Sequence, residues 1–395
     1  MTPPTPTPPT PTQPTPTPPG SMLLTAGTVI APDAVHTPGW VDMRAGLIVA
    51  CGAGEPPRKP DFGFAQGALA PGYVDIHTHG GGGSSFNDAD TDAAVARITA
   101  THLAHGTTTM MASLVTAPLD EFEHTVAALA RQVEQGVLAG IHLEGPWLSP
   151  AYRGAHDESL LREPDAETVD RLMRAGRGCV RMVTIAPELK GGLAAVTQIV
   201  GFGAVVAIGH TDANYDLTRQ AIAAGATAGT HVFNAMRQIH HREPGPALAL
   251  LEDPAVFTEL IADGVHLHPA IVRFIIDSPS RPVFVTDAMA AAGADEGDYK
   301  LGALDVSVAD GQARLADGTI AGSVLTLSEA VRYAVHTAGV PLAVAVRAAT
   351  QNPADLIGLP DRGRLAAGHR ADLIVLDAGL SVTATMQAGA WCARA

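Results

Sequence analysis

Cysteine is scarce in this chain: among 395 residues there are only three, Cys51, Cys179 and Cys392. They lie far apart and are odd in number, which excludes a disulfide framework and fits a reducing compartment. The sequence also lacks an apolar run of the ~20 residues that a membrane-spanning helix needs. Its N-terminus has neither the basic start nor the apolar centre of a secretory signal. We therefore expect a cytoplasmic protein that makes no contact with a membrane.

Positive charge is also scarce, with 25 Lys and Arg residues against 40 Asp and Glu residues and a formal net charge of -15. This balance excludes nucleic-acid binding, because a phosphate backbone requires a basic surface. A small anionic substrate is not excluded, because it needs only a local cationic pocket. Lysine is especially rare and occurs only as Lys59, Lys190 and Lys300.

Composition divides the chain into three parts. Residues 1–20 are almost entirely Thr and Pro, so they cannot bury apolar surface and are predicted to form a disordered tail. Short apolar runs separated by Gly and Pro follow over residues 21–70, and similar runs occur over residues 360–395. We expect these two segments to form one small β-sandwich domain beside a larger domain over residues 71–359.

Strand-like and helix-like patterns alternate through the larger domain. The strand candidates are 73–79, 108–114, 138–144, 180–186, 204–210, 228–233, 257–262 and 282–287. Helical patterns lie between most of them, for example over 91–104, 119–134, 214–224 and 324–338. This alternation predicts an α/β fold, a (β/α)8 TIM barrel, whose chemistry lies at the carboxyl ends of the strands.

A doubly wound open sheet is the structural alternative. Gly80–Gly83 follows a strand, as the glycines of a dinucleotide site do, but the two histidines before it have no role in dinucleotide binding. The segment 298–320 is expected to be a hairpin insertion before the last helix, with its turn at Asp310–Gly311.

The first barrel strand carries two histidines. Pro71–Gly80 reads Pro-Gly-Tyr-Val-Asp-Ile-His-Thr-His-Gly, and its alternation of apolar and polar residues is typical of a strand. His77 and His79 would share one face of that strand, roughly 7 Å apart at their Cα atoms. Two imidazoles at the carboxyl end of a strand, followed by glycines, are suited to hold a metal ion.

Further polar residues occur where other predicted strands end. Glu144, His210 and His231 would supply two imidazoles and one carboxylate from three strands, a ligand set that suits a catalytic zinc-like metal. The same ligands also suit iron, manganese or cobalt. Asp287, on the last strand, would accept a proton from the metal-bound water, whose pKa such a metal lowers to ~7.

These motifs resemble those of a known family. Pro71–Gly80 and Gly363–Leu373 are similar to conserved segments of the amidohydrolase superfamily. More narrowly, the chain resembles the N-acetylglucosamine-6-phosphate deacetylases from about residue 21 to the C-terminus. The segments that carry this narrower resemblance are His142–Trp147, Gly209–Ala213, Thr230–Met236, Arg242–Gly245, Asp263–His266 and Thr286–Ala288. Because several separate motifs occur in the right order, the resemblance is highly specific.

The resemblance implies roles for individual residues. Glu144, His210 and His231 match the main metal ligands, and Asp287 matches the catalytic acid and base. His77 and His79 imply a second metal bridged by Glu144, so one or two metals per subunit are expected. The residues that match the substrate pocket are Ala155, His156, Asn234, Ala235, Arg242, His266, Ile320, Ala321 and Gly322.

Two of these substrate residues have particular roles in the resemblance. His156 matches a residue beside the acetyl carbonyl of the substrate. Arg242 matches a phosphate ligand that reaches the active site of the neighbouring subunit in a homodimer, and the guanidinium fork suits a phosphate monoester. The structural alternative for Arg242 is an ion pair with Glu243 or another carboxylate.

The resemblance implies a metal-dependent hydrolase, with zinc as the first expectation. It would remove the acetyl group from N-acetyl-D-glucosamine 6-phosphate, giving D-glucosamine 6-phosphate and acetate, in amino-sugar catabolism and cell-wall recycling. The alternatives are a deacetylase of the galactosamine epimer and an amidohydrolase that acts on a cyclic amide. The latter would place a lysine in the metal site, but Lys190 lies beyond the fourth strand, which favours Glu144 as the bridge.

Two non-enzymatic alternatives are a barrel that serves only as an assembly scaffold and a sugar-phosphate binding protein. A scaffold would lack metal ligands, and this sequence retains every candidate ligand. A binding protein would have no need of Asp287.

Overall fold

The computed structural model describes residues 20–88 and 91–394. The Thr/Pro-rich tail expected over residues 1–20 lies, apart from Gly20, outside the described residues. Within the described part of the chain, no helix combines the length and the apolar character that crossing a membrane requires.

The larger domain is a closed parallel barrel, as predicted. Strand β6 (Tyr73–Asp75) pairs in parallel with β9 (Thr107–Met110), and β10 (Ala112–Val115) follows after one residue. From β10 a parallel sheet runs in chain order through β11 (Ile141–Glu144), β12 (Val180–Ile185), β13 (Val205–Ile208), β14 (Ala228–Gly229), β15 (Phe257–Leu260) and β16 (Arg281–Phe284). The ring closes where the amide of Asp287 donates to the carbonyl of His77 at 2.9 Å.

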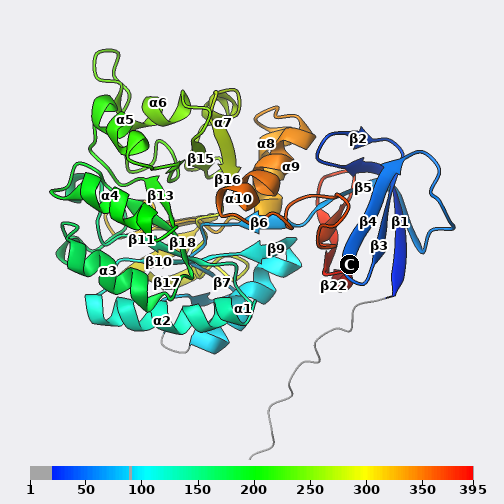
Figure 1. Cartoon of the computed structure of the whole chain (residues 1–395), viewed down its shortest axis with the longest axis horizontal. Coiled ribbons are helices and arrows are strands. Elements are labelled where there is room, and N and C mark those ends of the chain that lie inside the picture. Colours follow the sequence, from blue (N-terminus) through cyan, green and yellow to red (C-terminus); the bar gives the residue numbers. More distant parts are fainter. Residues whose placement is uncertain (1–19, 89–90, 395) are drawn as a thin grey trace, which may run out of the picture.

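Helices surround this barrel (Figure 1). They are α1 (Thr91–Ala104), α2 (Leu119–Glu134), α3 (Ala166–Ala175), α4 (Gly192–Gly201), α5 (Tyr215–Ala223), α6 (Gly245–Leu251), α7 (Pro269–Ile276), α8 (Leu327–His336), α9 (Leu342–Ala349) and α10 (Gln351–Leu356). The bounds predicted for α1 and α2 match the structure. The predicted helix 324–338 was too long, because Thr326 accepts a hydrogen bond from the amide of Glu329 and so caps α8 at its start.

The barrel strands are shorter than predicted at their carboxyl ends. The strand expected over 73–79 ends at Asp75, and the one expected over 204–210 ends at Ile208. His210, His231 and Asp287 follow their strands with positive φ angles of 47°, 25° and 49°. Such angles are uncommon for residues other than glycine, and here they turn the chain out of the barrel directly after each strand. These three side chains therefore lie on irregular backbone just beyond the strands, whereas Glu144 is the last residue of β11.

The second domain joins both ends of the chain, as predicted, and lies to one side of the barrel (Figure 1). Its single sheet has the order β22-β21-β20-β5-β1-β3-β4, with β2 paired to β1. The strands are β1 (Ser21–Ile30), β2 (Val35–His36), β3 (Gly39–Arg44), β4 (Leu47–Ala53), β5 (Phe62–Pro71), β20 (Leu373–Leu376), β21 (Val382–Gln387) and β22 (Ala390–Arg394). Strand β5 is parallel to β1 and antiparallel to β20, and it leads through Gly72 directly into β6. The sheet has an apolar core of its own, which includes Val41 and Met386.

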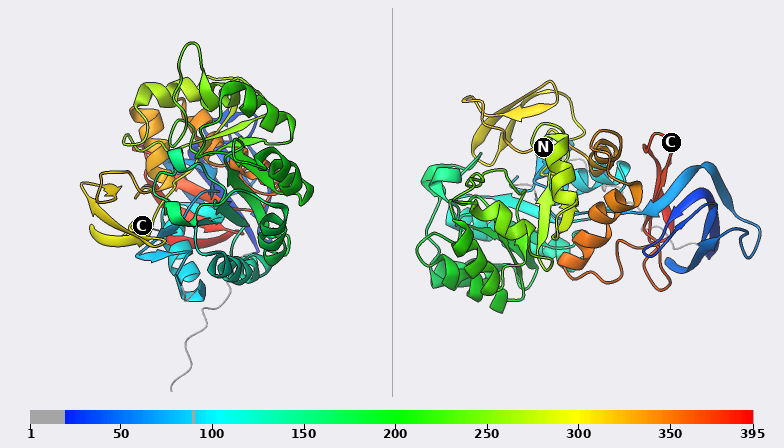
Figure 2. Two further views of the ribbon diagram at one scale, coloured as in Figure 1. Left: turned by 90° about the vertical axis from the view of Figure 1, so that its left-hand side faces the viewer. Right: turned by 90° about the horizontal axis from the view of Figure 1, so that it is seen from above.

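The expected hairpin insertion is a three-stranded antiparallel sheet of β17 (Gly297–Leu301), β18 (Leu304–Ala309) and β19 (Gln312–Arg314). The predicted turn at Asp310–Gly311 is correct, but a second turn at Gly302, with φ of 57°, adds β17. This small sheet projects from the barrel (yellow in Figure 2). Its apolar face packs against residues that follow β16, such as Met289, and so covers the carboxyl end of the barrel.

Candidate active site

A cavity of 370 Å³ opens at the carboxyl ends of the barrel strands. It is lined by Glu144, Ala151, Tyr152, Gly154, Ala155, His156, His210, His231, Asn234, Ala235, His266, Asp287, Leu301, Thr319, Ile320 and Gly322. Residues from eight separate parts of the chain thus meet at one place, which is the arrangement expected for the active site of a barrel.

Glu144 lies at the centre of a buried histidine cluster. Its Oε1 atom is 3.1 Å from Nε2 of His210 and 3.1 Å from Nε2 of His231. Its Oε2 atom is 3.0 Å from Nε2 of His79. Oε1 is also 3.5 Å from Nε2 of His77, so one carboxylate contacts imidazoles of both groups.

These side chains form two possible ligand groups that share Glu144. One consists of His77, His79, Glu144 and Asp287, and the other of Glu144, His210 and His231. Within each group the ligand atoms lie within 4.8 Å of one another. A carboxylate shared in this way is suited to bridge two cations.

The spacing of the imidazole nitrogens fits a metal ion. The Nε2 atoms of His77 and His79 are 3.2 Å apart, and those of His210 and His231 are 3.1 Å apart. Tetrahedral zinc with bonds of about 2.0–2.1 Å places two ligand nitrogens roughly 3.3 Å apart. The residues present thus fit a divalent cation at each group.

Hydrogen bonds at the opposite ring nitrogens favour the tautomer that a metal needs. Nδ1 of His210 donates to the backbone carbonyl of Tyr152 at 2.9 Å, and Nδ1 of His77 donates to Oε2 of Glu259 at 3.0 Å. In both rings the Nε2 lone pair is therefore directed at the cluster. His142 differs, because both of its ring nitrogens bond to hydroxyls of Ser113 and Thr184. It is therefore not available as a ligand.

The carboxylates and imidazoles of the cluster shift the pKa values of one another. Burial raises the pKa of Asp287, but His77 and His79 lower it more, so the pKa lies well below the usual range for a carboxyl. Burial lowers the pKa of His79, but bonds to Asp287 and Glu144 outweigh this effect and raise it to about 9. Both shifts indicate that the carboxylates are ionised and stabilise positive charge beside them.

His156 is in a different electrostatic state. Burial, with a further contribution from His210, lowers its pKa to about 4, so the imidazole is neutral at pH 7. Its Nδ1 atom is 3.0 Å from Oγ1 of Thr116, and its Nε2 atom is 3.6 Å from Oε2 of Glu144. A neutral imidazole that carries its proton on Nε2 can donate a hydrogen bond from this position to a bound carbonyl oxygen.

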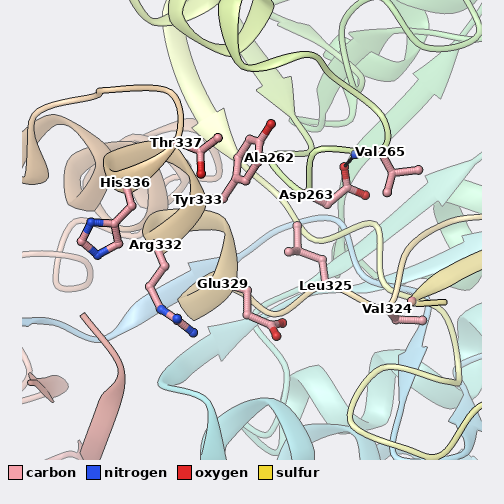
Figure 3. Close-up of a pocket in the computed structure, with 11 residues that line it drawn as sticks. Ala262, Asp263, Val265, Val324, Leu325, Glu329, Arg332, Tyr333, His336 and Thr337 are labelled. Atoms are coloured by element: carbon pink, nitrogen blue, oxygen red, sulfur yellow. Dashed lines mark hydrogen bonds between the residues drawn. The ribbon is translucent and has the colours of Figure 1, made fainter. Parts of the chain in front are cut away.

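His266 lines this cavity and bonds to a residue that lines a second one. Its Nδ1 atom donates to Oδ2 of Asp263 at 2.6 Å. Asp263 also lines a cavity of 440 Å³ between the loop after β15 and helix α8, together with Glu329 and Tyr333 (Figure 3). The two bonded residues therefore line different cavities.

The structure brings together most of the predicted site residues. Glu144, His210, His231 and Asp287 line the cavity, as do Ala155, His156, Asn234, Ala235, His266, Ile320 and Gly322. His77 and His79 belong to the cluster but lie behind the cavity surface, and Ala321 is buried beside it.

Two cationic residues lie away from this cavity. Arg242 does not line it and is exposed, with Nη1 2.7 Å from Nε2 of the neighbouring His241. Lys190 is exposed between β12 and α4, so the feature that would indicate a cyclic-amide hydrolase, a lysine in the metal cluster, is not found among the described residues.

Sequence reasoning missed several residues of the site. Tyr152, Leu301 and Thr319 line the cavity, and Leu301 comes from the inserted sheet. Thr116 contacts the predicted substrate residue His156, and Glu259 contacts the predicted metal ligand His77. The only sequence signal for Glu259 was a carboxylate within the apolar strand pattern of residues 257–262.

Comparisons with known proteins agree with this geometry. The model of the amidohydrolase family matches residues 68–394. The N-acetylgalactosamine-6-phosphate deacetylase of Escherichia coli O157:H7 is 36% identical over 320 residues, which cover 80% of this chain and 85% of the relative. The N-acetylglucosamine-6-phosphate deacetylase of Bacillus subtilis (strain 168) is 32% identical over 383 residues, which cover 93% and 96%.

A solved structure is also similar over nearly the whole chain. It is that of a mutant N-acetyl-D-glucosamine-6-phosphate deacetylase from Mycobacterium smegmatis in complex with N-acetyl-D-glucosamine-6-phosphate. The two chains are 52% identical with a TM-score of 0.92, and the match covers 95% of this chain and 100% of the other.

Proposed function

This chain belongs to the amidohydrolase family, and we propose that it hydrolyses the acetamide of N-acetyl-D-glucosamine 6-phosphate to D-glucosamine 6-phosphate and acetate. The observation that carries this function is the placement of Asp287 beside the buried cluster of Glu144 and histidines at the floor of one cavity. The similarity to a deacetylase solved with this substrate supports the same reaction. The reaction belongs to amino-sugar catabolism and cell-wall recycling.

The metal ligands follow from the two groups around Glu144. Glu144, His210 and His231 would hold one divalent cation, and His77 and His79 would hold a second that Glu144 bridges. Zinc is the first candidate, and iron, manganese and cobalt accept the same nitrogen and oxygen ligands. When bound, the cation lowers the pKa of a coordinated water and polarises the amide carbonyl.

Asp287 carries out the proton transfers. Its low pKa makes it an ionised carboxylate that accepts the proton of the attacking water. It then delivers that proton to the nitrogen of the leaving amine. General acid–base help of this kind contributes about 10²–10⁴-fold to a rate.

His156 stabilises the developing oxyanion. Nε2 of His156 faces Oε2 of Glu144 at 3.6 Å, so we assign the ring proton to Nε2, with Nδ1 accepting from the hydroxyl of Thr116 at 3.0 Å. Nε2 then donates to the carbonyl oxygen as it gains negative charge. Donors that are already oriented toward this oxygen before the reaction cost no reorganisation during it.

The sugar phosphate occupies the rest of the cavity, against Asn234, Ala235, His266 and the segment 320–322. We propose that the phosphate is bound by Arg242 from the neighbouring subunit of a homodimer. Two observations support this proposal: Arg242 does not line the cavity of its own chain, and the adjacent Ile239 is 45% exposed although it is apolar. An exposed apolar side chain beside a cationic loop suits a subunit interface.

The few cysteines suit a cytoplasmic location.

The test is an acetate-release assay with the purified, metal-loaded protein. Asp287→Asn should retain metal and bind substrate, yet lose most of its kcat. The exposed Asp216→Asn in the first turn of α5 is the matched control and should have the wild-type kcat. Wild-type turnover by Asp287→Asn would refute the role of Asp287.

The same assay distinguishes the substrate alternatives. Faster acetate release from the gluco epimer than from the galacto epimer is expected, with little release from either sugar without its phosphate. A preference for the galacto epimer would favour the function named for the Escherichia coli relative.

A further inference from the structure

Glu259 is a buried carboxylate that the mechanism above does not use. It lies within β15, and its side chain has no exposed surface. No Lys or Arg pairs with it among the described residues, and its Oε1 atom is buried without a hydrogen-bond partner there. An ionised carboxylate is costly to bury unless opposite charge and hydrogen bonds compensate. The interactions that offset the cost of burying Glu259 must therefore come from the metal cluster that its side chain faces.

Its partners belong to both metal groups. The Oε2 atom accepts a hydrogen bond from Nδ1 of His77 at 3.0 Å and from the backbone amide of His231 at 3.3 Å. His77 is a ligand of one group, and His231 is a ligand of the other. A single carboxylate oxygen therefore contacts ligands of two different groups.

The bond to His231 supports an unusual backbone. His231 has a φ angle of 25°, which is unfavourable for a residue with a Cβ atom. The carbonyl of Glu259 also accepts a hydrogen bond from the amide of Val232 at 2.8 Å. Glu259 thus holds this turn through its side chain and its main chain, and the turn directs the imidazole of His231 toward Glu144.

The bond to His77 has an electronic effect. A carboxylate that accepts the Nδ1 proton makes Nε2 a stronger ligand and fixes the orientation of the ring. Because this arrangement depends on the negative charge of Glu259, a neutral side chain of the same shape would be a weaker support.

We propose that Glu259 is a positioning residue that sets the metal affinity of the two-metal cluster, through the ring of His77 and the backbone of His231. The inference rests on the proposed metal-dependent function. Removing a carboxylate of this kind typically weakens metal binding 10–100-fold, which gives the size of the effect expected for Glu259→Gln.

The experiment measures metal binding directly. Metal-stripped wild type and Glu259→Gln are titrated with Zn²⁺ against a competing chelator, and metal per subunit is counted after dialysis. Glu259→Gln should bind one of two Zn²⁺ ions 10–100-fold more weakly. Glu259→Asp keeps the negative charge on a shorter side chain, so its Zn²⁺ affinity should lie between those of the wild type and Glu259→Gln. Thr258→Ser is the matched control, because its hydroxyl bonds to Ser280 away from the cluster.

A second background separates positioning from a general structural role. In His77→Ala the same change to Gln should weaken Zn²⁺ binding less than it does in the wild type, since the ring of His77 is gone and only the route through the backbone of His231 remains. Wild-type affinity and stoichiometry in Glu259→Gln would overturn the proposal, as would an equal loss in both backgrounds. The titration needs no substrate, so a protein that binds Zn²⁺ but releases no acetate would refute the proposed function and leave this test intact.

Discussion

Thr116 is a small buried residue whose hydroxyl lies 3.0 Å from Nδ1 of His156 and, in the proposed mechanism, holds the ring proton on Nε2. Replacement by valine keeps the shape but removes the donor to Nδ1, so Nε2 of His156 no longer reliably carries a proton. We expect Thr116→Val to lower kcat about tenfold, or ~1.4 kcal/mol in the barrier, with KM nearly unchanged. Steady-state kinetics of acetate release would measure this split.

Thr116→Ser is the control for this prediction. It restores a hydroxyl at the same place and should recover most of the wild-type kcat. If the valine variant turned over as fast as the wild type, the assigned tautomer of His156 would be wrong.

Single residues were predictable where their neighbours in the sequence carried a pattern. Glu144 ends an apolar strand, His210 and Asp287 each follow one, and the closed barrel brings the strand ends together. Glu259 and Thr116 could not be assigned in this way. Their partners, His77 and His156, are 182 and 40 positions away in the chain. Which side chains meet across the barrel interior depends on its closure and on the turn angles after each strand.

Among the helices, α3 offers a direct test of capping. Oδ1 of Asp165 accepts a hydrogen bond from the amide of Thr168 at 2.9 Å, and this bond lowers the pKa of Asp165 below its ordinary value of 3.8. We expect Asp165→Ala to lower the free energy of unfolding by about 1 kcal/mol at pH 7. Urea denaturation followed by circular dichroism would measure it.

The pH dependence of this cap has a definite sign. Because the folded pKa is depressed, the stabilisation is complete above pH 3.8 and is lost as the pH falls through the lower folded value. The difference between wild type and Asp165→Ala should therefore narrow in acid. Asp165→Asn retains a hydrogen-bond acceptor but has no titrating charge. Its free energy of unfolding should therefore lack the pH dependence that Asp165 contributes. A gap between wild type and alanine variant that is independent of pH would contradict the assignment.

Element types were predictable, and element ends were less so. The bounds of α1 and α2 followed from apolar periodicity, whereas β6 ends before His77 although the alternation continues through His79. The reason is that residues 77–79 bond to the segment after β16, at the seam where the barrel closes. No local pattern in the sequence reports this seam.

At the scale of the whole molecule, Arg242 gives a test of subunit exchange. If it serves the neighbouring active site, Arg242→Ala and Asp287→Asn damage different parts of the dimer. Each variant alone should be nearly inactive. When the two variants are co-expressed in equal amounts, about half of the dimers are mixed, and each mixed dimer has one intact site of its two. About a quarter of wild-type activity should therefore return. An Arg242 that serves its own chain would give no recovery.

The overall fold was predictable because its signals are repeated many times. Eight strand patterns alternating with helices predict a barrel, and similar apolar runs at both ends predict a shared domain. The sequence did not reveal that β5 would be the common strand, parallel to β1 and antiparallel to β20. That arrangement depends on the position at which the chain passes from β5 into β6 of the barrel, and on the return of β20 to the edge of β5.

The central place of β5 has a consequence for the order of events during synthesis. β1, β3, β4 and β5 leave the ribosome early, but the edge of β5 that receives β20 stays unpaired until residues 373–376 emerge, after the entire barrel. An open strand edge is prone to pair with other chains. The nascent chain therefore has an unpaired, aggregation-prone strand edge for most of its translation, and the last strands to be synthesised cover that edge.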